Sequence, residues 1–86
     1  MRPALKDMTL QAFAVLKGFT TQTALARASG VPRAVVSDMY RGGRGYPKAR
    51  DQLVQALWPE AAGKKRQEAR ALRALLQLID NSRSQA

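Results

Sequence analysis

The segment from Thr21 to Gly42, TQTALARASGVPRAVVSDMYRG, constrains the fold of this chain more than any other part. It holds two helical patterns that are interrupted at Gly30. Thr21 is a natural N-cap for a helix over Gln22–Ser29, because its hydroxyl can accept a free amide hydrogen of the first turn. Gly30 supplies the positive φ that a sharp turn needs, and Pro32 stands where a missing N–H costs nothing. The segment therefore predicts two short helices joined by a tight turn.

The second of these helices has two faces of opposite character. Its inward face consists of apolar residues at helical spacing, namely Val31, Val35, Val36 and Met39. Its outward face consists of small, polar and arginine residues, namely Arg33, Ala34, Ser37, Asp38 and Arg41. A helix with such an outward face can enter the major groove of DNA, and the order of helix, tight turn and second helix is that of the helix-turn-helix.

Three more helices are expected around this pair, over Leu5–Lys17, from Pro47 to about Leu57, and from Lys64 to about Asp80. The apolar stripe predicted for the first comprises Leu5, Met8, Ala12, Phe13 and Leu16. The inward residues of the fourth are Leu53, Val54 and Leu57, and those of the fifth are Ala69, Leu72, Leu76 and Ile79. From Arg83 onward the chain is polar and is expected to fray.

Composition limits the classes of function open to this chain. Its 86 residues suit one small domain, and 15 Lys and Arg against 6 Asp and Glu give a net charge of +9, which favours a polyanionic partner. The chain has neither cysteine nor histidine, so it lacks the commonest metal ligands and the commonest general base. Its acidic residues are scattered and form no paired catalytic constellation. We therefore expect no enzyme activity, no metal and no cofactor.

The sequence also predicts no membrane partner, because no apolar run reaches transmembrane length. The first residues, MRPALKDMTLQ, lack the continuous apolar stretch of a secretory signal, since Lys6 and Asp7 interrupt it. We expect a cytoplasmic bacterial protein that is associated with the nucleoid.

The same segment resembles a known family position by position. Gln22-Thr23-Ala24-Leu25-Ala26, Gly30-Val31, Val36-Ser37 and the closing Arg41-Gly42 are similar to the helix-turn-helix of the Cro and CI type phage repressors. The resemblance implies an all-α, compact five-helix lambda-repressor-like domain with the motif in its second and third helices. Residues 1–63 would form the DNA-binding core, and residues 64–86 would add a C-terminal helix and tail. Two departures are Ser29, where the family has an apolar residue, and Pro32, which replaces the usual Ser or Thr cap.

Carried over by position, the family's core places correspond to Leu25, Ala26, Gly30, Val31, Val36 and Met39. Its groove-facing places correspond to Gln22, Arg33, Ala34, Ser37, Asp38 and Arg41. Arg33 stands in the first turn, where it can bond guanine O6 and N7 together. Asp38 can accept from cytosine N4 or hold Arg41, three residues on, in a useful rotamer, and we favour the second role.

Base contacts are thus expected from Arg33, Ala34, Ser37, Asp38 and Arg41. Phosphate contacts are expected from Thr21, Gln22, Thr23, Arg44, Tyr46, Lys48 and Arg50. The fifth helix leaves two interpretations open, since it can fold onto its own core or form a two-fold dimer contact. We favour the dimer contact, formed by Leu72, Leu75, Leu76 and Ile79.

The function expected from these features is sequence-specific repression of transcription, of phage or prophage type. A homodimer would cover a pseudo-palindromic operator on double-stranded DNA and block a promoter by occlusion, and an antirepressor protein is a possible further partner. The alternative is a protein-interaction module, such as an antitoxin-like regulator whose C-terminal helix docks on another protein. RNA binding is less favoured, because the chain lacks the sheet-borne aromatic residues of most single-strand readers.

Overall fold

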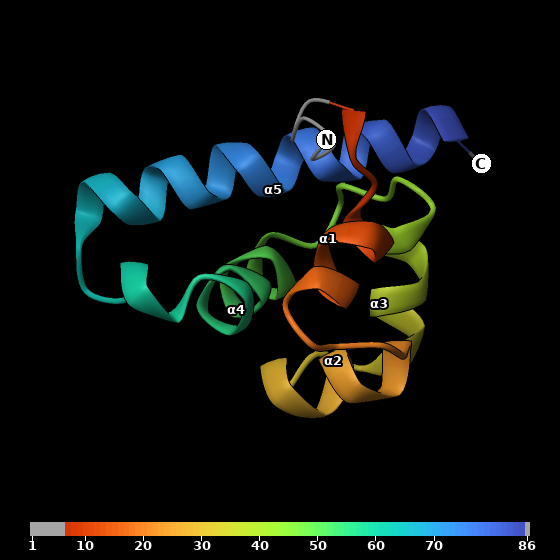
Figure 1. Cartoon of the computed structure of the whole chain (residues 1–86), viewed down its shortest axis with the longest axis horizontal. Coiled ribbons are helices and arrows are strands. Elements are labelled where there is room, and N and C mark those ends of the chain that lie inside the picture. The colour runs from red at the N-terminus through yellow and green to blue at the C-terminus, as the bar shows by residue number, and fades with distance from the viewer. Residues whose placement is uncertain (1–6, 86) are drawn as a thin grey trace.

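The chain folds into helices joined by short turns, as the computed structural model describes for residues 7–85 (Figure 1). The α-helices of this part are α1 (Leu10–Leu16), α2 (Gln22–Ser29), α3 (Arg33–Tyr40), α4 (Pro47–Leu57) and α5 (Lys65–Gln85). A short 3-10 helix, η2 (Pro59–Ala61), connects α4 to α5. Residues 7–85 contain no strand, and the all-α prediction is confirmed.

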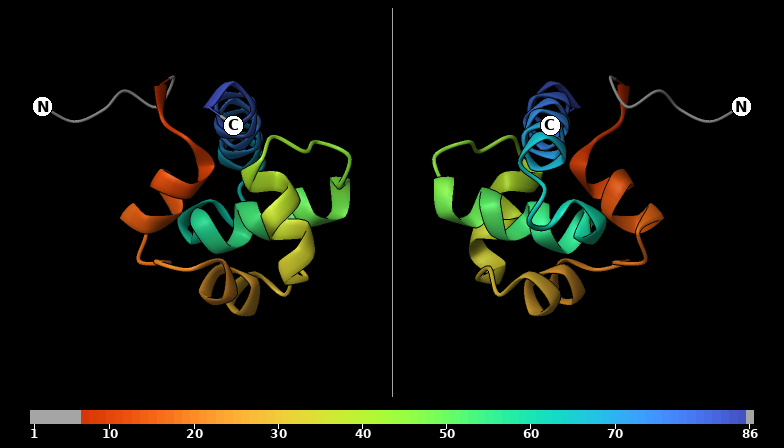
Figure 2. Two further views of the ribbon diagram at one scale, coloured as in Figure 1. Left: turned by 90° about the vertical axis from the view of Figure 1, so that its right-hand side faces the viewer. Right: turned by 90° about the vertical axis from the view of Figure 1, so that its left-hand side faces the viewer.

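The helices surround one hydrophobic core. α5 runs along one side of the molecule and packs against α1, α3 and α4, whereas α2 lies on the opposite side against α3 and α4 (Figures 1 and 2). Each α-helix contributes at least one fully buried side chain, and the largest of these are Leu10, Leu25, Met39, Leu53, Leu57, Leu75, Leu78 and Ile79. Because α5 supplies three of these eight, it is part of the core and not an appendage to it.

The predicted pair of short helices is present, and α2 has the predicted bounds. The Thr21 hydroxyl accepts a hydrogen bond from the Ala24 amide at 3.0 Å, which caps α2. Gly30 has a φ of +76°, the left-handed conformation that ends α2. Pro32 precedes α3 with no side-chain cap. α4 also matches its predicted range, with Leu53, Val54 and Leu57 all buried.

The prediction for α1 was wrong at its beginning and on its exposed face. The helix begins at Leu10 rather than Leu5, because the Thr9 hydroxyl accepts from the Ala12 amide at 3.1 Å and caps it there. Leu5 lies outside the described residues. Leu10 and Ala14 face the core, whereas Ala12 is exposed and Leu16 is 68% exposed. Met8 is buried as predicted, and Phe13 is half-buried with its ring stacked on Trp58 at 4.9 Å.

The prediction for α5 was wrong in its end and in most of its stripe. The helix continues to Gln85, so the segment from Arg83 is helical and not a frayed tail. The side chains it buries are Ala71, Leu75, Leu78, Ile79 and Ser82, and of the predicted stripe only Ile79 is fully buried. Ala69 is exposed, and Leu72 and Leu76 are half-buried. The buried row extends one turn further than the apolar residues do, because the small polar Ser82 completes it.

Candidate nucleic-acid interface

The outward face predicted for α3 is open to solvent. Arg33 and Ala34 are exposed and Ser37 is half-buried. Together with Gln22 from the first turn of α2, they line one shallow hollow of about 260 Å³. The structure thus brings together, from two helices, four of the residues that were predicted to face a groove.

The inward side of the same two helices is closed. Leu25, Val36 and Met39 are fully buried, and Val31 is 2% exposed. Ala26 is half-buried, and Gly30 is exposed in the turn. The predicted division of α3 into a buried apolar face and an exposed polar face is therefore confirmed.

Ser29, the polar residue at an expected apolar place, holds the turn between α2 and α3. Its hydroxyl donates to the Leu25 carbonyl at 2.7 Å and accepts from the Val31 amide at 3.2 Å. The second bond satisfies the Val31 amide, which lies outside both helices, and the first fixes the hydroxyl in place for it. Ser29 therefore closes the turn through hydrogen bonds, at a position where the resemblance led us to expect an apolar contact.

The Asp38 carboxylate is paired with two nearby side chains, those of Arg41 and Tyr46. Its Oδ1 lies 3.1 Å from Nη2 of Arg41, and its Oδ2 accepts a hydrogen bond from the Tyr46 hydroxyl. The Tyr46 hydrogen bond, followed by that of Arg41, lowers the pKa of the Asp38 carboxyl. The same hydrogen bond raises the pKa of Tyr46, because it favours the neutral phenol. The favoured pairing of Asp38 with Arg41 is confirmed, and Tyr46 is an additional partner that was not expected.

Several predicted phosphate contacts are turned toward the protein. Tyr46 donates its hydroxyl hydrogen to Asp38 and so has none for a phosphate. The Nε of Arg44 lies 3.6 Å from Oδ1 of Asp80 on α5. Arg50 is half-buried, and its Nε is buried without a hydrogen-bond partner. In this structure Asp80 therefore lies close to Arg44, Arg50 is only partly accessible, and the Tyr46 hydroxyl is occupied by Asp38.

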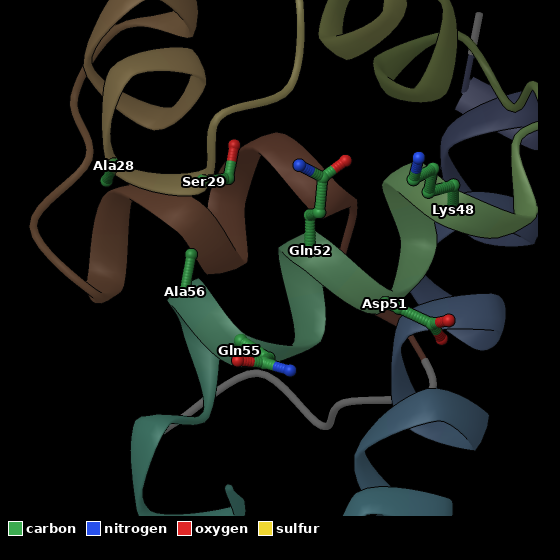
Figure 3. A pocket seen from close by; sticks show the side chains of 7 residues that line it. All are labelled: Ala28, Ser29, Lys48, Asp51, Gln52, Gln55 and Ala56. Carbon is green, nitrogen blue, oxygen red and sulfur yellow. The ribbon is translucent and has the colours of Figure 1, made fainter.

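The remaining predicted phosphate contacts surround the helix starts. Thr21, Thr23 and Lys48 are exposed, although the Thr21 hydroxyl already caps α2. Lys48 also borders a hollow between the end of α2 and α4, which is lined by Ala28, Ser29, Lys48, Asp51, Gln52, Gln55 and Ala56 (Figure 3). The lining carries one cation, one carboxylate and two amides, so its charges offset one another and do not mark an anion site.

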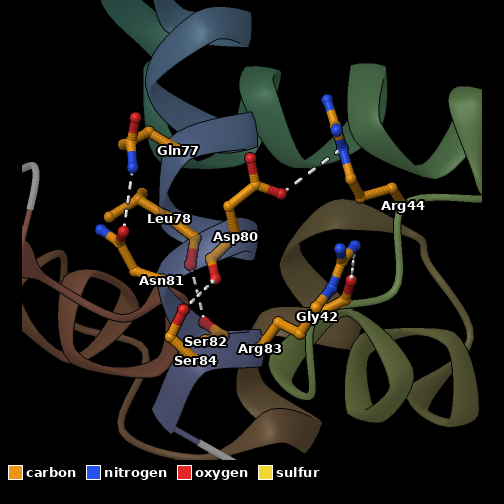
Figure 4. A network of polar contacts seen from close by, with 9 residues as sticks. All are labelled: Gly42, Arg44, Gln77, Leu78, Asp80, Asn81, Ser82, Arg83 and Ser84. Carbon is orange, nitrogen blue, oxygen red and sulfur yellow. Dashed lines mark hydrogen bonds and ion pairs between the residues drawn. The ribbon is translucent and has the colours of Figure 1, made fainter.

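The C-terminal part of α5 fixes the end of α3 (Figure 4). The Arg83 guanidinium donates to the Gly42 carbonyl at 3.1 Å. Gly42 has a φ of +98°, and a Cβ placed on it would lie 2.8 Å from Cα of Arg83 and even nearer to its Cβ. Only glycine permits both this φ and this approach of two backbones. Gly42, the second residue after α3, is thus packed directly against α5.

The same turn of α5 also holds the beginning of α1. The Ser82 hydroxyl accepts from the Leu10 amide at 2.9 Å and donates to the Leu78 carbonyl at 2.7 Å. Nδ2 of Asn81 donates to the Met8 carbonyl at 2.8 Å. Sequence reasoning missed this role because it ended the helix at Asp80. The signal was the continuation of small and apolar residues at helical spacing through Leu75, Leu78 and Ser82.

Two of the four residues assigned to a dimer contact are not available for one. Leu75 and Ile79 are fully buried in the core of their own protomer, so the prediction was wrong for this pair. Leu72 and Leu76 are half-buried. The large apolar side chains that are most exposed within residues 7–84 lie instead on α1, where Val15 is 44% and Leu16 is 68% exposed.

No described helix combines the length and the apolar character that crossing a membrane requires. Among the described residues, no group of three or more acidic, histidine or cysteine side chains is placed to hold a metal ion.

Comparisons with known proteins assign no family to the chain, because no protein-family model, no curated protein and no solved structure matches it. The resemblance to the Cro and CI type repressors therefore stays a prediction carried by the residues of the segment Thr21 to Gly42.

Because Gly42 packs directly against α5, we expect one added methyl group at this position to lower the stability of the fold strongly. Gly42→Ala introduces backbone strain and forces α3 and α5 apart, and we expect it to lower the free energy of unfolding by about 2–4 kcal/mol. Urea denaturation measures the loss. Gly18→Ala is the control, because Gly18 has a similar φ of +97° with nothing within 4 Å of a new Cβ. Equal losses in the two variants would contradict a clamp at Gly42.

The pairing of Asp38 with Tyr46 predicts a change in titration. In Tyr46→Phe the pKa of Asp38 should rise toward its ordinary value of 3.8, because the strongest hydrogen bond to the carboxylate is lost. NMR titration of the Asp38 carboxyl measures this, with Tyr40→Phe as the control. Tyr40 has a pKa that is raised by burial alone. An unchanged Asp38 titration in Tyr46→Phe would contradict the pairing.

The lowered pKa also sets the pH range in which the pairing stabilises the fold. Its contribution is fully present above pH 3.8, the ordinary pKa of the carboxyl. It is lost as pH falls through the lower pKa of the folded protein. Wild type should therefore lose more stability than Tyr46→Phe on acidification through that range.

Proposed function

We propose that the protein binds double-stranded DNA sequence-specifically with α3 in the major groove, and that it represses transcription by covering a promoter. One observation carries the proposal: Gln22, Arg33, Ala34 and Ser37 share an exposed hollow on the side of α2 and α3 that the core does not use. A small solvent-facing helix face with an arginine in its first turn is the shape that base readout in a groove requires.

Arg33 is the residue proposed to choose the sequence. Within the described residues it forms no ion pair, so its guanidinium is free to bond O6 and N7 of a guanine. Such a bidentate contact contributes about 1–3 kcal/mol of discrimination against other bases. Ala34 and Ser37 support this role because their small side chains let the helix approach the base edges closely.

Asp38 is proposed to act through Arg41 rather than by touching a base. Its two carboxylate oxygens are already occupied by Arg41 and Tyr46, which leaves less capacity to accept from cytosine N4. The pairing also reduces the repulsion between this carboxylate and nearby phosphates. Arg41 keeps a side chain that is 68% exposed, so it can reach the duplex from the end of α3.

Net charge supplies the sequence-independent part of the proposed binding. The chain carries +9, and each phosphate that a Lys or Arg neutralises releases counterions from the duplex. Affinity should therefore fall steeply between about 50 and 200 mM salt. Lys48 and Arg33 are exposed and can contribute at once, whereas Arg44 must first leave Asp80.

Repression by occlusion needs no chemistry, and a homodimer would place two copies of α3 about 34 Å apart on one side of the duplex. Of the residues first assigned to this dimer, Leu72 and Leu76 keep accessible surface. We propose that they contribute to the two-fold contact in place of the full set of four.

A protein-interaction module is the second candidate function. The observation that favours it is the exposed apolar pair on α1, Val15 and Leu16, which lies beside a mainly apolar hollow over residues 8–16. Exposed apolar patches mark interaction sites more often than scattered single residues do. This patch belongs to α1 rather than to the C-terminal helix expected from the sequence.

Selection from random duplex DNA tests the proposed readout. With Arg33→Ala we expect loss of preference at one base pair in each half-site, together with a modest loss of total affinity. Lys48→Ala is the control and should weaken binding to all sequences about equally. If Arg33→Ala also weakens all sequences equally, Arg33 contacts phosphate only. A wild type that selects no sequence would overturn the proposed function.

Sedimentation equilibrium tests the proposed dimer. Leu76→Glu places a charge in the contact, and we expect the dimer dissociation constant to rise at least about tenfold, equivalent to about 1.4 kcal/mol. Leu16→Glu is the control on the other apolar surface and should leave self-association unchanged. Dissociation by Leu16→Glu alone would assign the contact to α1, and a monomeric wild type would exclude the dimer.

A further inference from the structure

The N-terminal half of α5 carries a second concentration of positive charge. Lys65, Arg66, Arg70 and Arg73 belong to this helix, and Lys64 directly precedes it. All five side chains are exposed. Of these, Arg66, Arg70 and Arg73 are spaced i, i+4, i+7 and therefore lie along one face of the helix. We call these three residues the arginine row.

The arginine row faces away from the core. The buried residues of the same helix, among them Ala71, Leu75 and Leu78, fall on the opposite side at 3.6 residues per turn. Between Arg66 and Arg73 the helix rises by about 10 Å. That length spans about three phosphates of one DNA strand at about 3.4 Å each.

No carboxylate neutralises the arginine row within the described residues. The ion pairs there join Arg41 to Asp38 and Arg44 to Asp80. Glu68, the acidic residue nearest in sequence, has its Oε2 within 3.2 Å of the Gly63 amide at the helix start. The row therefore presents three permanent charges, and guanidinium groups suit bidentate contact with phosphate oxygens.

The row is remote from the face of α2 and α3 that is proposed to bind DNA. Figure 1 shows the N-terminal half of α5 at the end of the molecule away from α3, beside η2 and the end of α4. Figure 2 shows α5 and α2 on opposite sides of the core. A duplex that lies along α3 is separated from the row by the body of the protein, so the row can add nothing to that contact.

We propose that the arginine row is a second, sequence-independent DNA surface, through which one protomer holds a second duplex segment while α3 occupies the first. This inference rests on the proposed function at α2 and α3. A duplex fits the row better than an anionic membrane does, because an interfacial helix needs a free apolar face, and of the leucines of α5 only Leu72 and Leu76 keep partial access to solvent.

A bridging assay tests the second surface. One duplex, carrying the selected sequence, is attached to beads, and a fluorescent duplex of random sequence is added with at most one protein per attached duplex. Wild type should bring the fluorescent duplex to the beads. Arg66→Gln/Arg73→Gln should reduce this capture at least fivefold and leave binding to the attached duplex unchanged. For this double variant, the slope of log affinity for the fluorescent duplex against log salt concentration should also be shallower than for wild type, by about 1.8.

The matched control is Lys17→Glu, which changes the net charge by the same two units at the exposed residue that directly follows α1. It should bridge nearly as well as wild type. Equal bridging by Arg66→Gln/Arg73→Gln and wild type would overturn the proposal, and so would equal loss in Lys17→Glu. Parallel loss of binding to the attached duplex would place both surfaces on one duplex and overturn it as well.

Two further arms of the assay separate this proposal from the proposed function at α3 and from membrane binding. If wild type selects no sequence, a duplex of random sequence is attached to the beads instead. Loss of bridging in the double variant then supports the arginine row, although sequence-specific binding at α3 fails. Vesicles rich in phosphatidylserine replace the fluorescent duplex in the last arm. Stronger capture of these vesicles than of DNA, lost in the double variant, would identify a membrane surface instead and overturn the proposal.

Discussion

The close approach of α5 to Gly42, just beyond the end of α3, is the constraint on which the placement of α3 depends. α3 has eight residues and no side-chain cap at its beginning, and helices this short are marginal in water without tertiary packing. Its buried residues, Val36 and Met39, anchor one face. Gly42 then fixes its end against Arg83. The orientation of α3, which carries Arg33, therefore depends on Arg83 near the C-terminal end of the sequence.

One turn of α5 contacts both the end of α3 and the beginning of α1. Arg83 binds the end of α3, while the preceding Ser82 binds the first amide of α1. A change in this turn therefore acts on both helices at once, although neither Arg83 nor Ser82 lies on the proposed interface. α5 thus holds α3 in place within the same protomer. Only the N-terminal half and the outer face of α5 remain available for other contacts.

Local chemistry explains which parts of the fold could be predicted from the sequence. Thr21, Gly30 and Pro47 mark helix ends by capping or by φ, and the helices they bound were predicted correctly. The exposed face of α3 followed from its period alone. The pairing of Asp38 with Arg41 followed from their spacing on one helix, whereas Tyr46 reached Asp38 only because the loop after α3 folds back.

The parts that could not be predicted depend on contacts between distant residues. Whether Leu75 and Ile79 meet a partner or their own core is decided by the packing of α1, α3 and α4 against α5. The sequence predicts that Arg44 is a free cation, whereas in the fold its guanidinium lies close to the Asp80 carboxylate. Ser82 lies beyond the predicted helix end at Asp80, and its bond to the Leu10 amide joins residues that are 72 positions apart.

The hydrogen bond between Tyr46 and Asp38 has a consequence for how the protein responds to its surroundings. It moves the two pKa values apart, the carboxyl downward and the phenol upward, and the chain contains no histidine that would titrate between them. Neither this pair nor a histidine therefore supplies a change of side-chain charge near neutral pH. For the proposed DNA binding we therefore expect regulation by ions, ligands or other macromolecules rather than by protonation of this pair.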